Sequence, residues 1–398
     1  MTMRYSERVR QIAPSMTLTI DSLAKTMKKE GKDVVNFGAG EPDFDTPRYV
    51  KDAAIEAVNA GKTKYTPAPG IPELRDAIAG RYNKKYGFSF TGANVVVSTG
   101  AKQALFNAIQ ATVNPGDEVI IFSPYWVTYP EIIKMAGGVP VIVETEEEDM
   151  FVPKRDQIEA KVTDRTVGIM FSNPSNPCGK IYDRSILSMI ADVAGEHDLV
   201  IISDEIYDEL CYDRETVSIA ALSEDARSRT VIVNGMSKSY AMTGWRMGYT
   251  IADEQLTKYM SAYQSHSSSN PNSIAQYASL EALKGPQEDL RNMAKVFSAR
   301  ADLVAKLYGE IPGLSFMKPE GAFYTFPNIS SAFGKSYKGQ KITDSASFCE
   351  ILLKEKMVAV VPGKAFGYDK CFRLSFATSE ENIVKGLTRI REFFSELE

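Results

Sequence analysis

The chain has 398 residues, of which 44% are hydrophobic and 24% charged, and its formal net charge at pH 7 is -5. This composition excludes a mainly disordered chain, and the length predicts two domains or one large domain with a satellite. The negative charge argues against nucleic acid or an anionic membrane as the main partner, so we expect small-molecule ligands.

Cysteine and histidine usage gives no sign of a disulfide framework or a metal site. The four cysteines, Cys178, Cys211, Cys349 and Cys371, lack Cys-x-x-Cys spacing, and the chain has only two histidines. The N-terminus lacks the apolar core of a signal peptide, and no apolar run is long enough to span a bilayer. We therefore expect a cytoplasmic protein without a metal, whose acid–base chemistry uses Lys, Tyr, Asp or a cofactor.

The first part of the chain is predicted to alternate helices with turn-rich loops. Apolar residues recur with helical spacing between 20 and 27, after a polar arm that includes Thr17. In the following turn-rich stretch, glycines such as Gly40 let the backbone approach a ligand closely. The predicted elements are a strand over 34–37, a loop over 38–47, a helix over 49–60, an exposed loop over 63–70 that carries Tyr65, and a helix that begins near Pro72.

Short apolar runs alternate with helix-length segments from residue 94 to residue 250. Such runs are typical of a mostly parallel sheet that helices cover on both faces. In open α/β sheets, ligands bind beyond the carboxyl ends of the strands, so the residues after each run are candidates for a site. The predicted strands are 95–97, 119–122, 139–143, 167–171, 199–202 and 231–233.

The residues after these runs form one chemically consistent set. Each alone also has an ordinary structural explanation, such as a helix cap or a packing aromatic. Together they supply an anion cradle, a stacking ring, a carboxylate for a ring nitrogen, donors to a phenolate oxygen and a reactive lysine, which are the requirements of pyridoxal phosphate. The set is Gly100, Ala101, Lys102, Trp126, Asn176, Asp204, Tyr207, Ser237, Lys238 and Arg246.

Lys238 carries the chemistry in this hypothesis. It lies among small and apolar residues, with Arg246 eight residues further along the chain. Loss of solvation and a nearby cation both lower the pKa of an amine, which makes the free amine needed for a Schiff base accessible. The planar guanidinium of Arg246 suits a phosphate. The alternative is a surface lysine beside a structural arginine.

The pattern changes beyond residue 250 to that of a second, α+β unit. Helical segments over 253–283 and 285–308 precede short strands over 314–316, 322–326, 358–361 and 372–377, and a last helix follows from residue 380. Arg373 alternates out of an apolar strand and suits a bidentate carboxylate clamp, the alternative being a half-exposed strand charge. The predicted organisation is an N-terminal arm with part of the small domain (1–45), a large cofactor-binding α/β domain (46–285) and a small C-terminal α+β domain (286–398).

Six ordered motifs resemble those of the fold-type I pyridoxal-phosphate aminotransferases, in particular the class I branch of bacterial aspartate aminotransferases. The resemblance covers essentially the whole chain. The motifs are residues 40–44, Tyr65 before Pro67, residues 173–179, residues 204–207, Ser237 and Lys238 with Arg246, and residues 373–376.

The resemblance implies a role for each site residue toward pyridoxal 5′-phosphate. Lys238 would form the Schiff base, and Asp204 would pair with the pyridinium nitrogen. Tyr207 and Asn176 would bind the ring's O3′, and Trp126 would stack on the ring and contact substrate. Phosphate would be held by Arg246 with Ser237 and by the amides of residues 100–102, with Tyr65 reaching the phosphate of the neighbouring subunit in a homodimer with shared active sites.

Substrate contacts are also implied, together with two departures from the commonest family pattern. Arg373 would bind the α-carboxylate and the Gly40 backbone would contact the substrate. Cys178 stands where many relatives have threonine. Gly235 stands where many have a phosphate-binding serine, which removes one phosphate contact.

The predicted reaction is ping-pong transamination between L-aspartate, or a similar acidic amino acid, and 2-oxoglutarate. Lys102 and Thr17 are predicted to bind the distal carboxylate, because a buried charge must be paired; Lys102 could instead add positive field for phosphate. Alternatives are an aminotransferase for aromatic or other amino acids or prephenate, a lyase or synthase on the same fold, and a silent sensor, for which the chain has no spare output segment. A nicotinamide-binding protein is disfavoured because Gly-x-Gly-x-x-Gly is lacking after the first strand.

Overall fold

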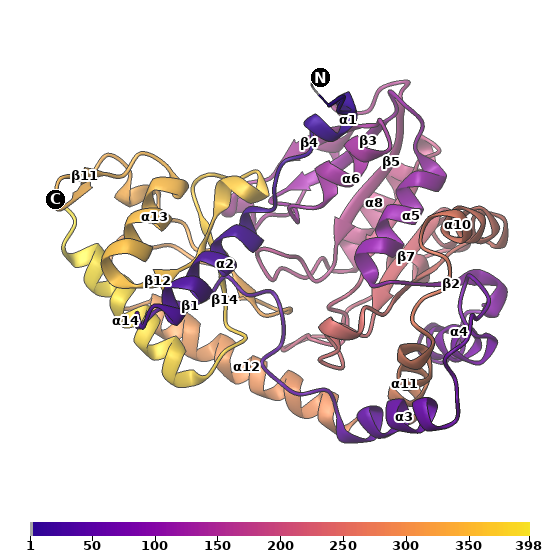
Figure 1. The fold of residues 1–398 in the computed structure, drawn as a ribbon. Helices are drawn as coiled ribbons and strands as arrows, with labels where there is room; N and C mark the ends of the chain where they lie inside the picture. The colour runs from indigo at the N-terminus through magenta and orange to yellow at the C-terminus, as the bar shows by residue number, and fades with distance from the viewer. Residues whose placement is uncertain (1–2) are drawn as a thin grey trace.

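A seven-stranded sheet forms the centre of the computed structural model, which describes residues 3–398 (Figure 1). The strand order is β2-β8-β7-β6-β5-β3-β4, and all pairs are parallel except the two that β8 makes with β2 and β7. The predicted mostly parallel α/β sheet is therefore confirmed. Its strands are β2 (Val95–Ser98), β3 (Glu118–Ser123), β4 (Val139–Glu144), β5 (Thr166–Ser172), β6 (Val200–Asp204), β7 (Thr230–Gly235) and β8 (Gly248–Ile251).

Helices cover both faces of this sheet because successive strand residues point to opposite faces. Val95 and Val97 pack into one core and Val96 into another. On the first face lie α3 (Arg48–Asn59), α4 (Pro72–Tyr86) and α11 (Ser273–Lys284), with α7 (Arg155–Glu159), α8 (Arg184–Glu196) and α9 (Glu224–Ser228) further along it. On the second lie α5 (Ala101–Thr112), α6 (Tyr129–Met135) and α10 (Glu254–Ser267).

A second unit combines the two ends of the chain, so that α2 and β1 lie beside C-terminal elements (Figure 1). β1 pairs in parallel with β12, and β13-β14-β9 form an antiparallel sheet. The domain boundaries stay a prediction. The elements are α2 (Met16–Lys29), β1 (Val35–Asn36), α12 (Glu288–Tyr308), β9 (Tyr324–Thr325), β10 (Ser336–Tyr337), β11 (Gln340–Lys341), α13 (Ser345–Lys356), β12 (Val358–Ala359), β13 (Val361–Pro362), β14 (Phe372–Ser375) and α14 (Glu380–Ser395).

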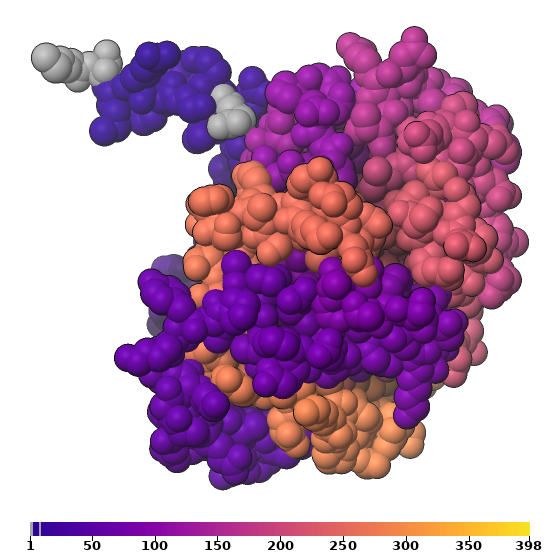
Figure 2. All heavy atoms as spheres, turned by 90° about the vertical axis from the view of Figure 1, so that its right-hand side faces the viewer, coloured from indigo at the N-terminus to yellow at the C-terminus, as the bar shows by residue number. Residues whose placement is uncertain are grey.

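The short helix α1 (Glu7–Arg10) belongs to an N-terminal segment that projects from the body of the molecule (Figure 2). The segment is anchored where the backbone N–H of Ala13 donates to the Glu131 carboxylate over 3.1 Å. Within residues 3–398, no helix is both long and apolar enough to cross a membrane.

Two predicted elements are wrong. The helix expected over 253–283 is two helices, α10 and α11, because Pro271 has no N–H to donate and Asn272 caps a new helix by accepting from the backbone N–H of Ala275. The strand expected over 314–316 is no strand, because Ser315 makes only an isolated bridge with Asn328.

Candidate active site

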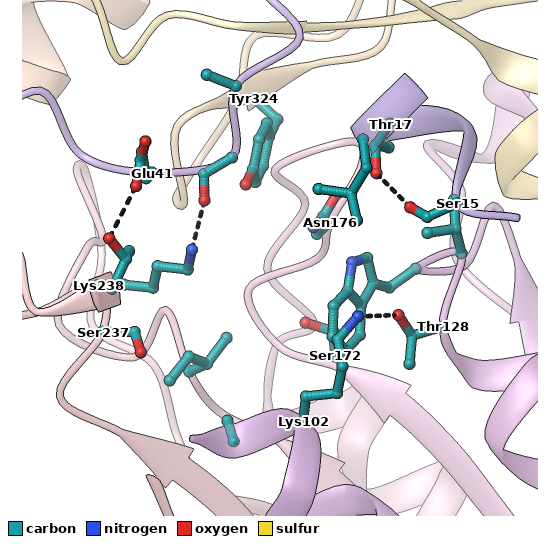
Figure 3. A pocket seen from close by; sticks show the side chains of 18 of the residues that line it. Ser15, Thr17, Glu41, Lys102, Thr128, Ser172, Asn176, Ser237, Lys238 and Tyr324 are labelled. Carbon is teal, nitrogen blue, oxygen red and sulfur yellow. Dashed lines mark hydrogen bonds between the residues drawn. The ribbon is translucent and has the colours of Figure 1, made fainter. Parts of the chain in front are cut away.

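A cavity of about 430 Å³ lies between the carboxyl ends of the parallel strands and the second unit (Figure 3). Most of the predicted site residues line it, although they come from segments far apart in the sequence. Those that line it are Thr17, Gly40, Ala101, Lys102, Trp126, Asn176, Asp204, Tyr207, Ser237, Lys238, Arg246 and Arg373.

Gly100 and Tyr65 are the predicted residues outside this lining. Gly100 precedes the first residue of α5 with φ +84°, and a Cβ there would lie 2.3 Å from Nη2 of Arg246. Glycine is therefore required for the guanidinium to lie against the start of α5. Tyr65 lies between α3 and α4 and is 91% exposed.

Lys238 follows the end of β7, and its side chain enters the cavity. Its Nζ donates to the carbonyl oxygen of Gly40 (Figure 3). Burial lowers the pKa of Lys238 to about 8; the charge of Glu41 opposes this shift, whereas Arg373 and Arg246 add to it. About a tenth of the amine is therefore uncharged at pH 7, far more than for an ordinary lysine, as a nucleophile and proton carrier requires.

Asp204 is the last residue of β6 and is almost fully buried. The hydroxyl of Tyr129 donates to its Oδ2 over 2.8 Å, and the backbone N–H of Ile206 donates to Oδ1 over 3.3 Å. Burial raises the pKa of Asp204 to about 6, and these two hydrogen bonds and Lys238 limit the rise. The carboxylate is therefore mostly ionised at neutral pH and can pair with a cationic ring nitrogen.

Arg373 is a buried cation that forms no ion pair among residues 3–398. Its Nη1 donates to Oδ1 of Asn176 over 3.1 Å and its Nη2 to the carbonyl oxygen of Gly38 over 3.0 Å, while Nε has no partner within the described chain. The guanidinium lies 4.5 Å from the ring centre of Tyr324, whose hydroxyl is 3.0 Å from that of Tyr207. A buried charge without a counterion is costly, so this arrangement suits an external carboxylate.

Two cations meet near the first turn of α5. The Nζ of Lys102 donates to Oγ1 of Thr128 over 3.0 Å and lies 4.7 Å from the ring centre of Trp126 (Figure 3). Burial lowers the pKa of Lys102, and the charge of Arg246 lowers it further. In residues 3–398 neither cation forms an ion pair. A helix N-terminus beside two unpaired cations suits an anion such as a phosphate.

Thr17 lies in the first turn of α2, with its Oγ1 2.9 Å from Oγ of Ser15. Figure 3 shows Thr17 and Ser15 on the side of the cavity that also carries Asn176. Ser15 and Thr17 therefore supply hydroxyls to the cavity wall, and the binding of a distal carboxylate by Thr17 stays a prediction.

Several cavity residues were missed by the sequence analysis. Tyr129 bonds Asp204, Tyr324 stacks on Arg373, and Thr128 holds Lys102. Tyr129 and Thr128 lie a few residues after β3, so the strand-end rule that found Trp126 could have found them. Tyr324 lies inside an apolar run, where nothing in the local sequence distinguishes it from a core aromatic. Glu41 lay within a recognised motif, but no role was assigned to it.

The fold and the grouping of these charges define an enzyme that transfers amino groups. In agreement, residues 32–390 match the family described as aminotransferase class I and II. The chain belongs to this family, which confirms the predicted resemblance.

Individual relatives are similar to this chain over almost its whole length. It is 45% identical over 392 residues to an aspartate aminotransferase of Bacillus subtilis, covering 98% of this chain and 99% of the relative. It is 46% identical over 391 residues to an aspartate/prephenate aminotransferase of Cereibacter sphaeroides, covering 98% of each.

Solved structures of aspartate aminotransferases have the same fold. The one from Rhizobium meliloti is 41% identical with a TM-score of 0.96, covering 100% of both chains. The one from Thermus thermophilus with maleate is 41% identical with a TM-score of 0.92, covering 98% of this chain and 100% of that one.

Proposed function

We propose that this chain is a pyridoxal 5′-phosphate-dependent aminotransferase that transfers the amino group of L-aspartate to 2-oxoglutarate in a ping-pong reaction. The observation that carries the proposal is the buried amine of Lys238, with its pKa lowered to about 8, in one cavity with Asp204 and Arg373. The names of the relatives in Bacillus subtilis and Rhizobium meliloti support aspartate as the donor.

The residues present fit the cofactor at both of its ends. Gly100 leaves the space in which Arg246 lies against α5, and the two unpaired cations there call for a polyanion such as a phosphate. The buried Asp204 carboxylate suits the pyridinium nitrogen, whereas Tyr207 and Asn176 offer hydrogen bonds to a phenolate oxygen. The indole of Trp126 would stack on the ring and Ser237 would join the phosphate site.

When bound, pyridoxal phosphate supplies an aldehyde carbon and an electron-accepting ring. Lys238 is the group that moves a proton from the substrate Cα, because its uncharged amine is accessible near neutral pH. Asp204 would offer its negative charge to the ring nitrogen, and the Tyr129 hydroxyl holds this carboxylate in place. Arg373 binds the α-carboxylate, with Asn176 and the Gly40 backbone beside it.

An acidic donor needs a second carboxylate partner, which we assign to Lys102 and Thr17. The Lys102 ammonium turns toward Thr128 and Trp126, and Thr17 lines the same cavity from α2. In the competing assignment, Lys102 binds the phosphate. Two observations support this alternative: the position of Lys102 in the first turn of α5 and the nearby charge of Arg246.

A homodimer with shared active sites would complete the phosphate site. Tyr65 is 91% exposed and lies outside the cavity of its own chain, as expected for a residue that serves a neighbouring subunit. The cytoplasmic location stays a prediction from the sequence.

The test is to incubate the holoprotein with single amino acids and 2-oxoglutarate and to measure glutamate. Aspartate is expected to give glutamate and oxaloacetate in equal amounts. No glutamate from a broad panel of amino acids would contradict the proposal and favour a lyase, a synthase or a silent binding protein. Because the Cereibacter sphaeroides relative is named for prephenate as well, prephenate is tested as amino acceptor.

A further inference from the structure

Arg373 depends for its position on the backbone of the segment that follows β1. Its Nη2 donates to the carbonyl oxygen of Gly38 over 3.0 Å, and Asn176 is its other acceptor within the described chain. The direction of the Gly38 carbonyl therefore fixes the plane of the guanidinium. A guanidinium that binds a carboxylate through parallel N–H groups is sensitive to this plane.

Asn36 holds the backbone that leads into that carbonyl. Along the strand, Val35 and Phe37 are buried in the core at 2% and 0% exposure, so the side chain between them points to the opposite face. There Oδ1 of Asn36 accepts from the backbone N–H of Gly38 over 2.9 Å. This local bond turns the chain as it leaves β1 and fixes the Phe37–Gly38 peptide, which places the Cα from which the Gly38 carbonyl extends.

The other half of the same amide binds the N-terminal helix. Nδ2 of Asn36 donates to Oδ1 of Asp21 over 2.8 Å, and Asp21 lies one turn beyond Thr17 on α2. Oδ2 of Asp21 is 2.7 Å from Nζ of Lys25, so this ion pair holds the carboxylate in place. If the Asn36 amide were flipped, its oxygen would face the Asp21 carboxylate and its NH2 group would face the Gly38 N–H. Only one orientation is therefore stable.

We propose that Asn36 is a positioning residue that orients Arg373 for the substrate carboxylate and couples it to helix α2. Hydrogen bonds connect Asp21, Asn36, Gly38 and Arg373 in that order. This inference rests on the proposed function, because it takes the carboxylate on Arg373 to be that of the substrate. The Asn36 amide thereby joins two walls of the cavity. One wall carries Arg373 for the α-carboxylate of an acidic donor, and the other is α2, which carries Thr17 for the distal carboxylate.

Four variants of the holoenzyme separate this role from simple structural support. Asn36→Ala removes both hydrogen bonds. Asn36→Asp keeps the acceptor for Gly38 but repels Asp21, and Asp21→Ala breaks the same link from the other side. The matched control is Thr26→Ala, which removes an exposed side-chain bond to the Ser22 carbonyl on the same helix without touching the connection.

The probes are the dissociation constant of maleate by calorimetry, and kcat and KM for aspartate and for alanine. Asn36→Ala is expected to raise the maleate constant and both KM values about tenfold with little change in kcat, because the α-carboxylate is common to both donors. Asn36→Asp and Asp21→Ala are expected to raise them about threefold. Adding Asp21→Ala to Asn36→Ala is expected to cause no further loss, since both break one connection.

Maleate binding and KM values unchanged in Asn36→Ala would overturn the inference, as would additive losses or an equal loss in Thr26→Ala. If Asn36→Ala does not fold, unchanged binding in both Asn36→Asp and Asp21→Ala overturns it instead. A wild-type protein that binds no maleate and forms no glutamate overturns the proposed function, and this inference with it.

Discussion

The two sides of the cavity are built differently. On one side, Ala101, Asp204 and Lys238 lie at or just after the ends of β2, β6 and β7, so strands of one sheet bring them together. On the other side, Arg373 is held by Asn176 and Gly38, which lie 197 and 335 residues away in the sequence. We call these the cradle side and the clamp side. The cradle depends on strand-end chemistry, whereas the clamp depends on the packing of the second unit against the first.

The largest expected effect comes from removing the reactive group of the cradle side. Lys238→Ala is expected to lower kcat by at least about a thousandfold and to abolish the visible absorption of the lysine-bound cofactor, because the variant lacks the cavity amine proposed to bind the cofactor and to move the proton. Circular dichroism is expected to show an intact fold. Lys258→Ala, at an exposed position on α10, is the control. Retained turnover and absorption would remove Lys238 from the mechanism.

The corresponding change on the clamp side is Arg373→Lys. A lysine cannot offer a carboxylate two parallel N–H groups as a guanidinium does, so kcat/KM is expected to fall roughly a hundredfold for every amino donor. The visible absorption of the cofactor is expected to persist, in contrast to Lys238→Ala. Loss of the cofactor from this variant would show that the two sides are not independent.

Lys102 lies on the cradle side, in the first turn of α5, and its substitution decides whether it binds the substrate or the phosphate. If it binds the distal carboxylate, Lys102→Ala lowers kcat/KM for aspartate about thirtyfold more than for alanine or phenylalanine, or about 2 kcal/mol of transition-state stabilisation. Thr17→Val, on the opposing wall, is expected to show the same preference with a smaller loss. Equal losses for all three donors, with weaker cofactor retention, would assign Lys102 to the phosphate.

The smallest effect concerns Glu205, a buried acid that follows the cradle residue Asp204 in the chain. Glu205 is buried outside the cavity and accepts from the hydroxyls of Ser203 and Ser218. Burial raises its pKa to about 7, so the native state keeps a proton that the unfolded state loses above the usual value of 4.5. The free energy of unfolding should therefore fall as pH rises from about 4.5 to 7.

Glu205→Gln keeps an acceptor for both serines and cannot ionise. Between pH 5 and pH 8, the free energy of unfolding of the wild type is expected to fall by roughly 2 kcal/mol more than that of the variant. Urea unfolding of both proteins at the two pH values measures this difference. Transamination is expected to continue in the variant. Parallel stability curves for the two proteins across this pH range would contradict the assignment.

The local sequence pattern also gave wrong or missing elements where other features decided the structure. A helical pattern runs through residues 253–283, but Pro271 and the cap at Asn272 divide it. Gly248 begins β8, an antiparallel strand that the six apolar runs did not include, because its glycine and threonine weaken the β pattern. A Cβ at Gly248 would lie 2.2 Å from the backbone nitrogen of Ala101, so this glycine is fixed by tertiary contact.

The sequence by itself determined six of the seven strands of the sheet and which residue types gather on the cradle side. Buried parallel strands read as apolar runs, and their carboxyl ends must gather at one edge, so the residues after each run could be grouped without coordinates. Arg373 was found for a similar reason, as a charge in an apolar strand. An arginine that alternates with apolar residues along a strand was enough to suggest a site for a carboxylate ligand.

Only the tertiary structure decided what holds each group and how it is charged. Burial sets the pKa of Lys238 near 8 and that of Asp204 near 6, and burial depends on how α2 and the second unit close over the strand ends. The partners Tyr324 and Asn36 come from segments whose local pattern indicates a core aromatic and an ordinary strand residue. Hydrogen bonds between segments hundreds of residues apart leave no local signal, because either partner alone is compatible with many folds.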